Sequence, residues 1–397
     1  MPWKASTPVD LRKEFIMRLG GGERLTDLCR EYGIARKTGE KFKRRFRADG
    51  LAGLQDRSRA PGFIPHKTPR ELVDLLVAHR RQHPTWGPRK LKETLQRTLG
   101  RTMPAASTIG DILTSAGLIV ARSRRPRHCA TPTALRPAAA PNDVWCIDYK
   151  GQFRLGDGSY CYPLTLTDQF SRFILCCEGM GAIADAAARE HCLEVFATYG
   201  LPTAIRSDNG IPFASRGLAG LTKLSVFWLR LGIELERTRP AHPQDNGRHE
   251  RMHRTLKQET TRPARANLLQ QQERFDAFVD EFNQRRPHQA LDMQPPAAVY
   301  VPSPIKCPTT LPPLDYSSCD DVRRVSQSGM LHLRGRRHLY LSAALAGEDV
   351  GLREDNEIDD RWLVTFAHLA LGYVEPGSHH FTALPVPTPT RLATGEV

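Results

Sequence analysis

The spacing of apolar residues predicts a first group of three short helices near the start of the chain. Apolar side chains recur at helical intervals over residues 9–18, 25–32 and 36–47. Gly33 separates the second stretch from the third and is typical of a tight turn. Two helices joined in this way, the second rich in cations, are typical of a helix-turn-helix DNA-binding domain. The alternative is an ordinary amphipathic helix with a solvated basic face, because such short patterns also arise by chance.

A second group of three helices is predicted directly after the first. Residues 69–79 are amphipathic, a helix begins at Pro88, and residues 106–116 form another stretch with apolar residues at helical spacing. We therefore expect a helix-turn-helix domain over residues 1–60 and a second, helix-turn-helix-like domain over residues 61–120.

The middle of the chain begins with strands and then alternates between helices and strands. Three closely spaced apolar runs, at residues 144–151, 160–168 and 172–177, predict strands that pair as an antiparallel meander. Further strands then alternate with helices, which is typical of an α/β domain, and we assign residues 141–300 to this domain. The expected helices are 182–199 and 218–231, the expected strands are 203–210 and 233–237, and a charged helix opens with Glu250.

The last part of the chain is again predicted to form strands. Residues 322–376 alternate in strand fashion with turns between the runs, which predicts a small β-barrel. We expect a basic and Pro/Ala-rich linker at 121–140, a proline-rich linker at 301–321 and a disordered tail at 377–397. The predicted fold class is multidomain, with N-terminal all-α helix-turn-helix modules, a central α/β core and a C-terminal small β-barrel.

The positive charge of the chain is confined to its first third. The formal net charge is +14 over 397 residues, but residues 1–140 carry +17 and residues 141–397 carry −3. A basic segment joined to a near-neutral one predicts a module that binds a polyanion such as DNA. The plainer alternative is that the charge serves solubility alone.

Composition also narrows the class of protein and its compartment. No apolar run approaches the roughly 20 residues that cross a bilayer, so we expect no membrane partner. The N-terminus shows no apolar stretch before a small-residue cleavage site, which gives secretion no support. Nine scattered cysteines without a C-x-x-C pair indicate reduced thiols in a cytosol.

Candidate DNA contacts come from two basic segments. The third helix of the first group would enter the major groove, with its first residues at base edges and its later cations on phosphates. The run RSRRPR in the first linker suits an arm that follows phosphates, although it also has the composition of a nuclear-type address. The candidate residues are Arg36, Lys37, Thr38, Lys41, Arg44, Arg45, Arg122, Arg124 and Arg125.

Three carboxylates are candidates for catalysis. Asp148 and Asp208 each end a predicted strand, and Glu250 opens a predicted helix. Because reactive groups gather at strand ends in α/β sheets, these distant positions can converge. Clustered carboxylates need neutralising, and all-oxygen ligands suit Mg²⁺ or Mn²⁺; two such ions can activate a water or hydroxyl for phosphoryl displacement. Taken singly, each acid is more often a turn or cap residue.

The helix that carries Glu250 adds further candidates. Arg254 and Lys257 follow Glu250 at helical spacing, hence on one face, where they would contact DNA phosphates near the acids. The alternative is a surface stripe of ion pairs, since Glu followed four residues later by Arg stabilises a helix. His242, His249 and His253 invite a zinc interpretation, but no cysteines stand near them at zinc-finger spacing.

The order of three motifs, WCIDYKG, SDNG and HPQDNGRHERMHRTLK, resembles the DDE transposases of bacterial insertion sequences with a retroviral-integrase-like core, and most closely insertion-sequence family 481. The resemblance covers nearly the whole chain and includes the segments WGPRKL and VGLREDNEID. It implies a ribonuclease-H-like core in which the catalytic and metal-binding triad is Asp148, Asp208 and Glu250, with two Mg²⁺ or Mn²⁺ ions per active site. Related sequences often read HPQQNG, whereas this chain has Asp245, which we expect to belong to a loop.

The resemblance also implies a function. It indicates a DNA transposase that binds the terminal inverted repeats of its element, cleaves the 3′ ends and joins them to target DNA. Such a protein would act as a homodimer or larger assembly in the bacterial cytoplasm, at the nucleoid, and its C-terminal barrel would be SH3-like with either a DNA-contacting or a structural role. The rival from another class is a domesticated, non-catalytic DNA-binding repressor built from the same modules. A nuclease that acts on RNA–DNA hybrids would share the metal site.

Overall fold

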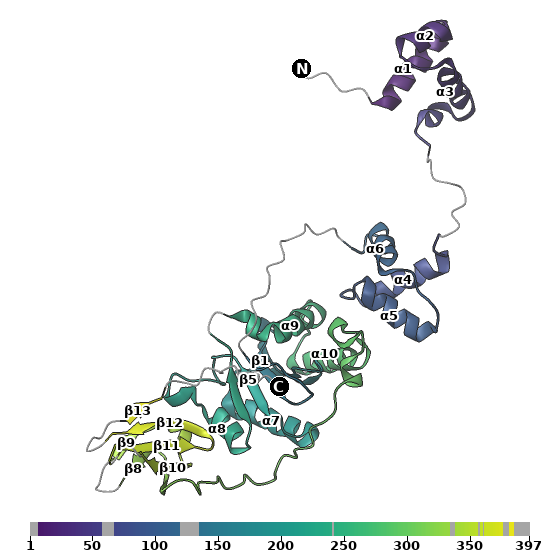
Figure 1. Ribbon diagram of the computed structural model, residues 1–397. Helices are drawn as coiled ribbons and strands as arrows, with labels where there is room; N and C mark the ends of the chain where they lie inside the picture. Colours follow the sequence, from purple (N-terminus) through teal and green to yellow (C-terminus); the bar gives the residue numbers. More distant parts are fainter. Residues whose placement is uncertain are drawn as a thin grey trace, which may run out of the picture. The chain divides into compact units, whose positions relative to one another are not determined.

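The computed structural model describes residues 7–57, 67–119, 135–239, 242–333, 338–355, 358–359, 361–375 and 381–384. The chain divides into two compact units, Met1–Pro69 and Arg70–Val397 (Figure 1). Each unit has its own hydrophobic core. Within the described ranges, no helix has the length and apolar character that a membrane crossing requires.

The first unit contains the first predicted group of three helices. Gly33, with a φ of +64°, forms the turn between α2 and α3, a backbone conformation that glycine adopts without strain. Gly39 lets α3 approach α2 closely, because a Cβ at this position would lie 2.6 Å from Sγ of Cys29. Phe15, Leu28 and Phe42 fill the core between the helices. The elements are α1 (Pro8–Gly20), α2 (Leu25–Glu31), α3 (Arg36–Asp49) and the 3-10 helix η1 (Gly50–Leu54).

The second unit opens with the second predicted group of three helices. Their core contains Trp86, Leu91 and Ile109, all almost fully buried. The ring of His83 stacks on Trp86 with centroids 4.1 Å apart, which closes the loop between the first two helices of the group. The elements are α4 (Arg70–Gln82), α5 (Pro88–Leu99) and α6 (Ala106–Ser115). Pro88 begins α5, as the sequence predicts, since proline lacks only an amide that has no partner at this position.

The centre of the second unit is a mixed sheet. The order of its main strands is β4, β3, β1, β5, β6: β3 is antiparallel to β1 and β4, whereas β1, β5 and β6 are parallel. All five strands are predicted by the sequence, and the two-residue β2 beside the start of β3 is not. The strands are β1 (Val144–Tyr149), β2 (Phe153–Arg154), β3 (Tyr160–Asp168), β4 (Ile174–Met180), β5 (Ala204–Ser207) and β6 (Glu234–Arg237).

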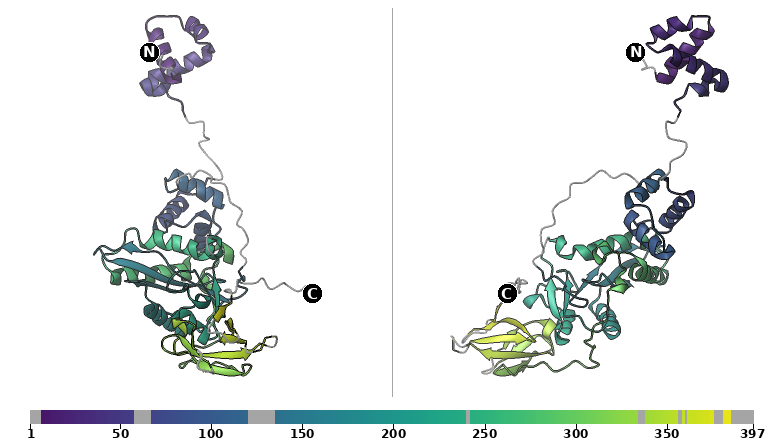
Figure 2. Two further views of the ribbon diagram at one scale, coloured as in Figure 1. Left: turned by 90° about the vertical axis from the view of Figure 1, so that its left-hand side faces the viewer. Right: turned by 45° about the vertical axis from the view of Figure 1, so that its right-hand side comes forward.

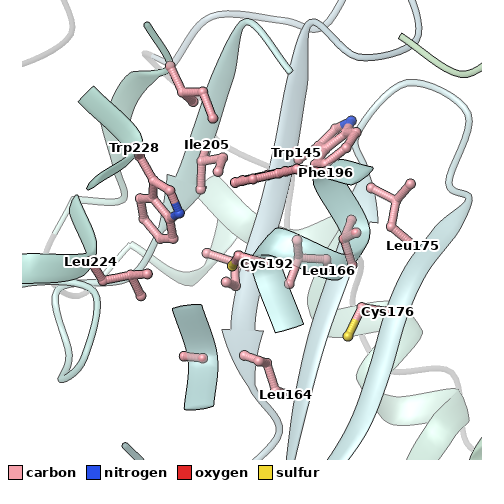
Figure 3. Packing of buried hydrophobic residues seen from close by; sticks show 14 of the residues in the cluster. Trp145, Leu164, Leu166, Leu175, Cys176, Cys192, Phe196, Ile205, Leu224 and Trp228 are labelled. Carbon is pink, nitrogen blue, oxygen red and sulfur yellow. The ribbon is translucent and has the colours of Figure 1, made fainter. Parts of the chain in front are cut away.

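Helices cover both faces of this sheet (Figure 2). On one face, Leu164 and Leu166 of β3 pack with residues of α7 and α8 such as Phe196 and Trp228 (Figure 3). On the other face, Met252 and Leu256 of α9 pack with phenylalanines of α10 and with Ile174 and Cys177 of β4. Side chains alternate along a strand, so the residues of β3 between these leucines face α9. The helices are α7 (Asp185–Tyr199), α8 (Lys223–Arg230), α9 (Gly247–Thr260) and α10 (Leu268–Asp280).

Short helical turns connect these elements. They include η2 (Leu218–Gly220), η3 (Pro243–Asn246), η5 (Gln289–Leu291) and η6 (Pro296–Ala298), and the π-helical turn η4 (Glu281–Arg285) extends α10. The segment after η6 lies against the end of α7, where the backbone N of Ser303 donates to the carbonyl oxygen of Tyr199 at 2.8 Å.

The small β-barrel that the sequence predicts is not confirmed in the described part of the C-terminal region. Five of them make an open antiparallel sheet in the order β13, β12, β11, β10, β7, and β8 and β9 form a separate hairpin. Among the described residues no sheet closes on itself. One physical reason is that Val226 and Leu229 of α8 pack in the core of this sheet, so a neighbouring helix covers it. The elements are β7 (Asp321–Arg324), β8 (Met330–His332), β9 (His338–Tyr340), η8 (Ala343–Leu345), β10 (Asp349–Glu354), β11 (Trp362–Phe366), β12 (Leu369–Val374) and β13 (Phe381–Ala383).

Candidate active site

Asp148 lies near the end of β1 and faces α9. Trp145 and Ile147 of the same strand pack in the core beneath α7 and α8. Since successive side chains of a strand point to opposite faces, the alternation turns Asp148 toward α9. Its Oδ2 lies 3.7 Å from Nδ1 of His253 on that helix. The pairing of β1 with β5 is parallel, so the ends of the two strands meet at one edge of the sheet.

Asp208 follows β5 directly and is exposed in a tight turn. Its Oδ1 accepts a hydrogen bond from the backbone N of Gly210 at 3.0 Å. Nδ2 of Asn209 donates to the carbonyl oxygen of Thr238, just beyond β6, at 2.6 Å, which ties the turn to the neighbouring strand. A Cβ at Gly210 would come within 3.0 Å of Oδ2 of Asp208, so glycine leaves room for the carboxylate.

Glu250 lies in the first turn of α9 and is exposed. The backbone dipoles at a helix N-terminus favour a negative charge there. Asp245, in the turn η3 before this helix, is 2% exposed and forms an ion pair of 2.8 Å with Arg239. The extra carboxylate of the HPQDNG motif therefore belongs to a loop with its own cation, as we expect from the sequence.

The three carboxylates influence one another electrostatically. The pKa of Asp148 is raised to about 7, first by burial, then by the charge of Asp208 and more weakly by that of Glu250, against an opposing effect of Lys150. In the described part of the chain none of the three acids forms an ion pair with a lysine or arginine. A set of carboxylate oxygens without a basic partner fits Mg²⁺ or Mn²⁺, which prefer such ligands.

A network of buried hydrogen bonds lies directly behind Asp148. Oγ1 of Thr165, on β3, donates to the carbonyl oxygen of Asp148 at 3.0 Å. The same oxygen lies 2.8 Å from Nε2 of His249 and 2.7 Å from Nε2 of His253. A hydroxyl has one proton and two lone pairs, so both imidazoles must donate to it through Nε2. Oγ1 of Thr167 is 2.7 Å from Nδ1 of His249 and donates to that nitrogen.

These bonds fix the protonation of both histidines. Burial lowers the pKa of His249 to about 3 and lowers that of His253 further, so both rings are neutral near pH 7. With Nε2 protonated in each ring, the lone pair of His253 Nδ1 is directed at Asp148 and both nitrogens of His249 are already bonded. Ligand atoms of Asp148, His249 and His253 lie within 4.8 Å of one another. We interpret His249 as a structural residue, because it would lose a hydrogen bond by binding a metal, whereas Nδ1 of His253 stays free beside Asp148.

The network shows which residues the sequence interpretation misses. Thr165 and Thr167 alternate with leucines on β3, a pattern that reads as an ordinary half-polar strand. His249 and His253 are one helical turn apart and flank Glu250, and this spacing is the signal that could have indicated a pair on the inner face of α9.

The cations of α9 are exposed. Arg254 and Lys257 point to solvent, and within the described ranges Glu250 makes no ion pair with Arg254. The ion-pair stripe considered from the sequence is therefore not formed. The DNA contacts proposed for these cations remain predictions.

The candidate DNA contacts of the first unit lie on two sides of α3. Arg36, Lys37, Lys41 and Arg44 are exposed, whereas Thr38 and Arg45 are partly buried. Thr38, Lys41 and Arg45 line a cavity of about 500 Å³ beside α1, and Nζ of Lys41 lies 4.9 Å from the centre of the Phe42 ring. Arg122, Arg124 and Arg125 lie outside the described residues.

Four family models match the chain. Two described as "Integrase core domain" match residues 138–243 and 231–296, which include all three acids. A "Helix-turn-helix domain" model matches residues 11–62, and a "Homeodomain-like domain" model matches residues 38–113. The matches support the ribonuclease-H-like integrase core and the N-terminal helix-turn-helix helices predicted from the sequence. They support an integrase- or transposase-like family.

Curated relatives with similar sequences are retroviral. The chain is 31% identical over 177 residues to the Gag-Pol polyprotein of baboon endogenous virus (strain M7), a match that covers 44% of this chain and 10% of the relative. It is 30% identical over 174 residues to the Pol polyprotein of feline endogenous virus ECE1, covering 44% and 16%. The chain thus spans less than a fifth of the length of these relatives. Insertion-sequence family 481 is an interpretation of the motifs alone.

Two solved structures show a weak similarity to this chain. One is the HTLV-2 integrase catalytic core domain in complex with magnesium, with 15% identity, a TM-score of 0.33, and coverage of 41% of this chain and 99% of that chain. The other is the simian T-cell lymphotropic virus intasome in complex with the PP2A regulatory subunit B56 gamma, with 16% identity, a TM-score of 0.37, and coverage of 77% and 99%. Both similarities are too weak to carry an argument about the function of this chain.

Proposed function

We propose that the protein is the DNA transposase of an insertion sequence, a polynucleotidyl transferase that cleaves the 3′ ends of its element and joins them to target DNA. The observation that carries the proposal is the pKa of Asp148, which is raised to about 7 first by burial and then by the charges of Asp208 and, more weakly, Glu250. Three acids drawn from distant motifs and left without a basic partner form a site for divalent cations rather than a structural cluster.

The three acids and the residues behind them would have different roles. Asp148, Asp208 and Glu250 would hold the Mg²⁺ or Mn²⁺ ions, two per active site. When bound, such ions supply the positive charge that stabilises the attacking and leaving oxygens of an in-line phosphoryl displacement. Thr165 would hold the strand of Asp148 in place through its bond to the carbonyl oxygen of that residue, and the same hydroxyl fixes the ring of His253 beside the carboxyl.

The helical modules supply the DNA-binding part of the proposal. The matches to helix-turn-helix and homeodomain-like models support DNA binding by residues 1–120, and the excess of positive charge in residues 1–140 supports it independently. We propose the terminal inverted repeats of the element as the DNA they recognise. We propose a dimer or larger assembly, because two ends must be brought together, and we propose the cytoplasm, at the nucleoid, as its location.

The alternative is a non-catalytic DNA-binding repressor with the same domains. It would use the helix-turn-helix modules without any chemistry at the acids. The unpaired carboxylates argue against it, because a protein without catalytic use for them would be more stable with a neutral residue at one of these positions.

The experiment uses purified full-length protein, Mg²⁺ and a labelled duplex taken from the DNA that flanks the coding sequence. Nicking and joining that vanish in Asp208→Asn would support the transposase. Sequence-specific binding without cleavage would support the repressor, and cleavage confined to the RNA strand of a hybrid would support a ribonuclease-H-like nuclease.

A further inference from the structure

A cavity of about 560 Å³ adjoins α9, and its lining includes Thr167 and His249 of the hydrogen-bond network behind Asp148. Its walls come from α5, the turn between β3 and β4, α9, and the segment that follows α10. Pockets of this size accept a small ligand such as a nucleotide. The basic residues that line it are Lys90, Arg172, Arg248, Arg251, Arg254 and Arg286, and Met252, Phe282 and His288 are among the other lining residues.

The cavity is strongly basic. Five arginines and one lysine line it, against a single carboxyl, that of Asp168. This carboxyl is already occupied: its Oδ1 accepts hydrogen bonds from N and Oγ of Ser171, and its Oδ2 accepts one from N of Asn142 at 2.8 Å. This carboxyl is therefore held by bonds of its own, and the lining of the cavity keeps an excess of positive charge.

Several of these cations have no internal partner. Arg248 donates to the carbonyl oxygen of Gln169 at 3.1 Å, and Arg286 is paired with Glu259 at 2.8 Å. In the part of the chain that the structure describes, the side chains of Lys90, Arg251 and Arg254 form no hydrogen bond or ion pair. Like charges held together in this way repel one another unless an anion enters.

The pKa values of two lining residues reflect this crowding. Burial, followed by the charge of Arg248 and more weakly by that of Arg251, lowers the pKa of Arg172 to about 10, against an opposing effect of Asp168. Burial, followed by the charge of Arg286, lowers the pKa of Lys90 to about 7. A bound phosphate would counter both effects, because it supplies the opposite charge inside the same low-dielectric space.

The cavity also offers an apolar and aromatic wall. The rings of Phe282 and His288 lie 4.8 Å apart, and the side chain of Met252 lines the cavity with them. Nε2 of His288 is buried and has no hydrogen-bond partner within the described ranges. Ring surface, a free polar nitrogen and a set of cations together match the base and the phosphate of one nucleotide.

The cavity and the acidic cluster share one helix. Arg251 directly follows Glu250, and Arg254 lies four residues after Glu250, about 6 Å along the axis. This distance is comparable to the spacing of successive phosphates in an extended strand. A duplex is too wide to enter, so the occupant must be unpaired.

We infer that this cavity binds one unpaired nucleotide of a DNA strand next to the acidic cluster, with the phosphate held by Arg251 and Arg254 and the base against Phe282 and Met252. The inference rests on the proposed function in one respect: cleavage of one strand there leaves a neighbouring nucleotide free to unpair. Binding of the nucleotide itself requires neither a metal ion nor a chemical step.

The test measures binding in the presence of EDTA, with Asp208→Asn as the background, so that failure of the proposed chemistry cannot affect it. The probe is an oligothymidylate of about eight nucleotides with one photoreactive 5-iodouracil. The test variant is Arg251→Gln/Arg254→Gln in the full chain. The matched control is Arg262→Gln/Arg265→Gln, which removes the same charge from exposed positions that do not line the cavity.

The inference predicts that the test variant binds the probe roughly tenfold more weakly than the control and loses cross-linking to the peptides that contain Met252 and Phe282, since each charge-assisted bond contributes strongly. Equal binding by both variants, or cross-links confined to residues 7–57, would overturn it. Thymidine monophosphate competing as well as the oligonucleotide would overturn the assignment to a strand and indicate a free nucleotide. Both variants are expected to melt as the parent does, because the altered arginines have no internal partner.

Discussion

Nδ1 of His253 lies 3.7 Å from Oδ2 of Asp148, while Nε2 of the same ring lies 2.7 Å from Oγ1 of Thr165. The imidazole therefore bridges α9 and the acid on β1 through a hydroxyl of β3. Because the hydroxyl also donates to the carbonyl oxygen of Asp148, one threonine orders three groups around this carboxyl. The position of the acid thus depends on residues outside the proposed metal-binding set.

Removing the hydroxyl of Thr165 tests this network. Thr165→Val keeps the shape of the side chain but leaves two imidazole N–H groups and one carbonyl without their partner. We expect the free energy of unfolding to fall by about 2 to 3 kcal/mol, measured by urea denaturation. Thr198→Val is the control, because this threonine is exposed on α7 and bonds only to the carbonyl oxygen of Glu194. A loss no larger than that of the control would show that the network does not stabilise the site.

The repulsion between Asp148 and Asp208 makes a prediction about pH. With a pKa of about 7, Asp148 holds its proton at about pH 5 in the folded protein and gives it up by about pH 8, so the two acids repel each other only at the higher pH. Asp208→Asn should therefore raise the stability of the metal-free protein by about 1 kcal/mol near pH 8 and leave it nearly unchanged near pH 5.

This difference is best read from melting curves of the two proteins in EDTA at each pH. Subtracting one protein from the other at each pH cancels the contribution of the buried histidines, which acts in the opposite sense. Their lowered pKa values cost stability as the pH falls below the pKa of free histidine. Asp74→Asn, an exposed change on α4, should show no such dependence. A stabilising effect of Asp208→Asn that is equal at both pH values would rule out the coupling.

Mg²⁺ should stabilise the wild-type protein and not the Asp208→Asn variant. A ligand that binds only the folded state at about ten times its Kd adds about 1.4 kcal/mol, which corresponds to a rise in Tm of a few degrees. Asp208→Asn should lose this rise while being the more stable protein in EDTA at about pH 8. Equal shifts in both proteins would place the bound ion elsewhere.

Lys257 is expected to contact DNA beside the acids. It is exposed on α9, two helical turns after Glu250. Lys257→Glu should weaken binding to terminal DNA roughly tenfold and lower the salt dependence of binding, without a change in circular dichroism. Lys306→Glu reverses the charge of another exposed lysine and serves as the control. Binding by Lys257→Glu that matches this control would contradict the contact.

The exposed cations at the start of α3 are predicted to enter the major groove. Lys37→Glu should abolish the preference for the terminal repeat over unrelated duplex, measured by fluorescence anisotropy of both DNAs, because a base contact contributes to specificity as well as affinity. Arg30→Glu, on the exposed side of α2, should weaken both complexes to a similar and smaller extent. An unchanged ratio of the two affinities in Lys37→Glu would disprove the assignment.

Much of the fold follows from local pattern in the sequence. The helices of both N-terminal groups and the five main strands of the central sheet were predictable, because apolar periodicity and turn residues such as Gly33 and Pro88 act locally. The convergence of Asp148 and Asp208 was also predictable, because parallel neighbouring strands end at the same edge.

Other features depend on contacts that a sequence does not display. The C-terminal strands alternate as barrel strands do, but α8 packs on their sheet, and no local pattern reveals which helix covers a sheet. The support of Asp148 by His253 requires β3 and α9 to be adjacent, a tertiary contact across 88 residues. The basic cavity likewise combines four segments whose charges appear unrelated along the chain.

The central claim is that the three acids catalyse phosphoryl transfer in DNA. The most direct measurement is the single-turnover rate at which a labelled 3′ end of the element is joined to target DNA in Mg²⁺, for Asp148→Asn, Asp208→Asn, Glu250→Gln and the control Asp157→Asn. Each triad variant should lose about a thousandfold or more in rate while still binding the terminal duplex, and the control should match the wild type. A triad variant that joins ends at the wild-type rate would contradict the account.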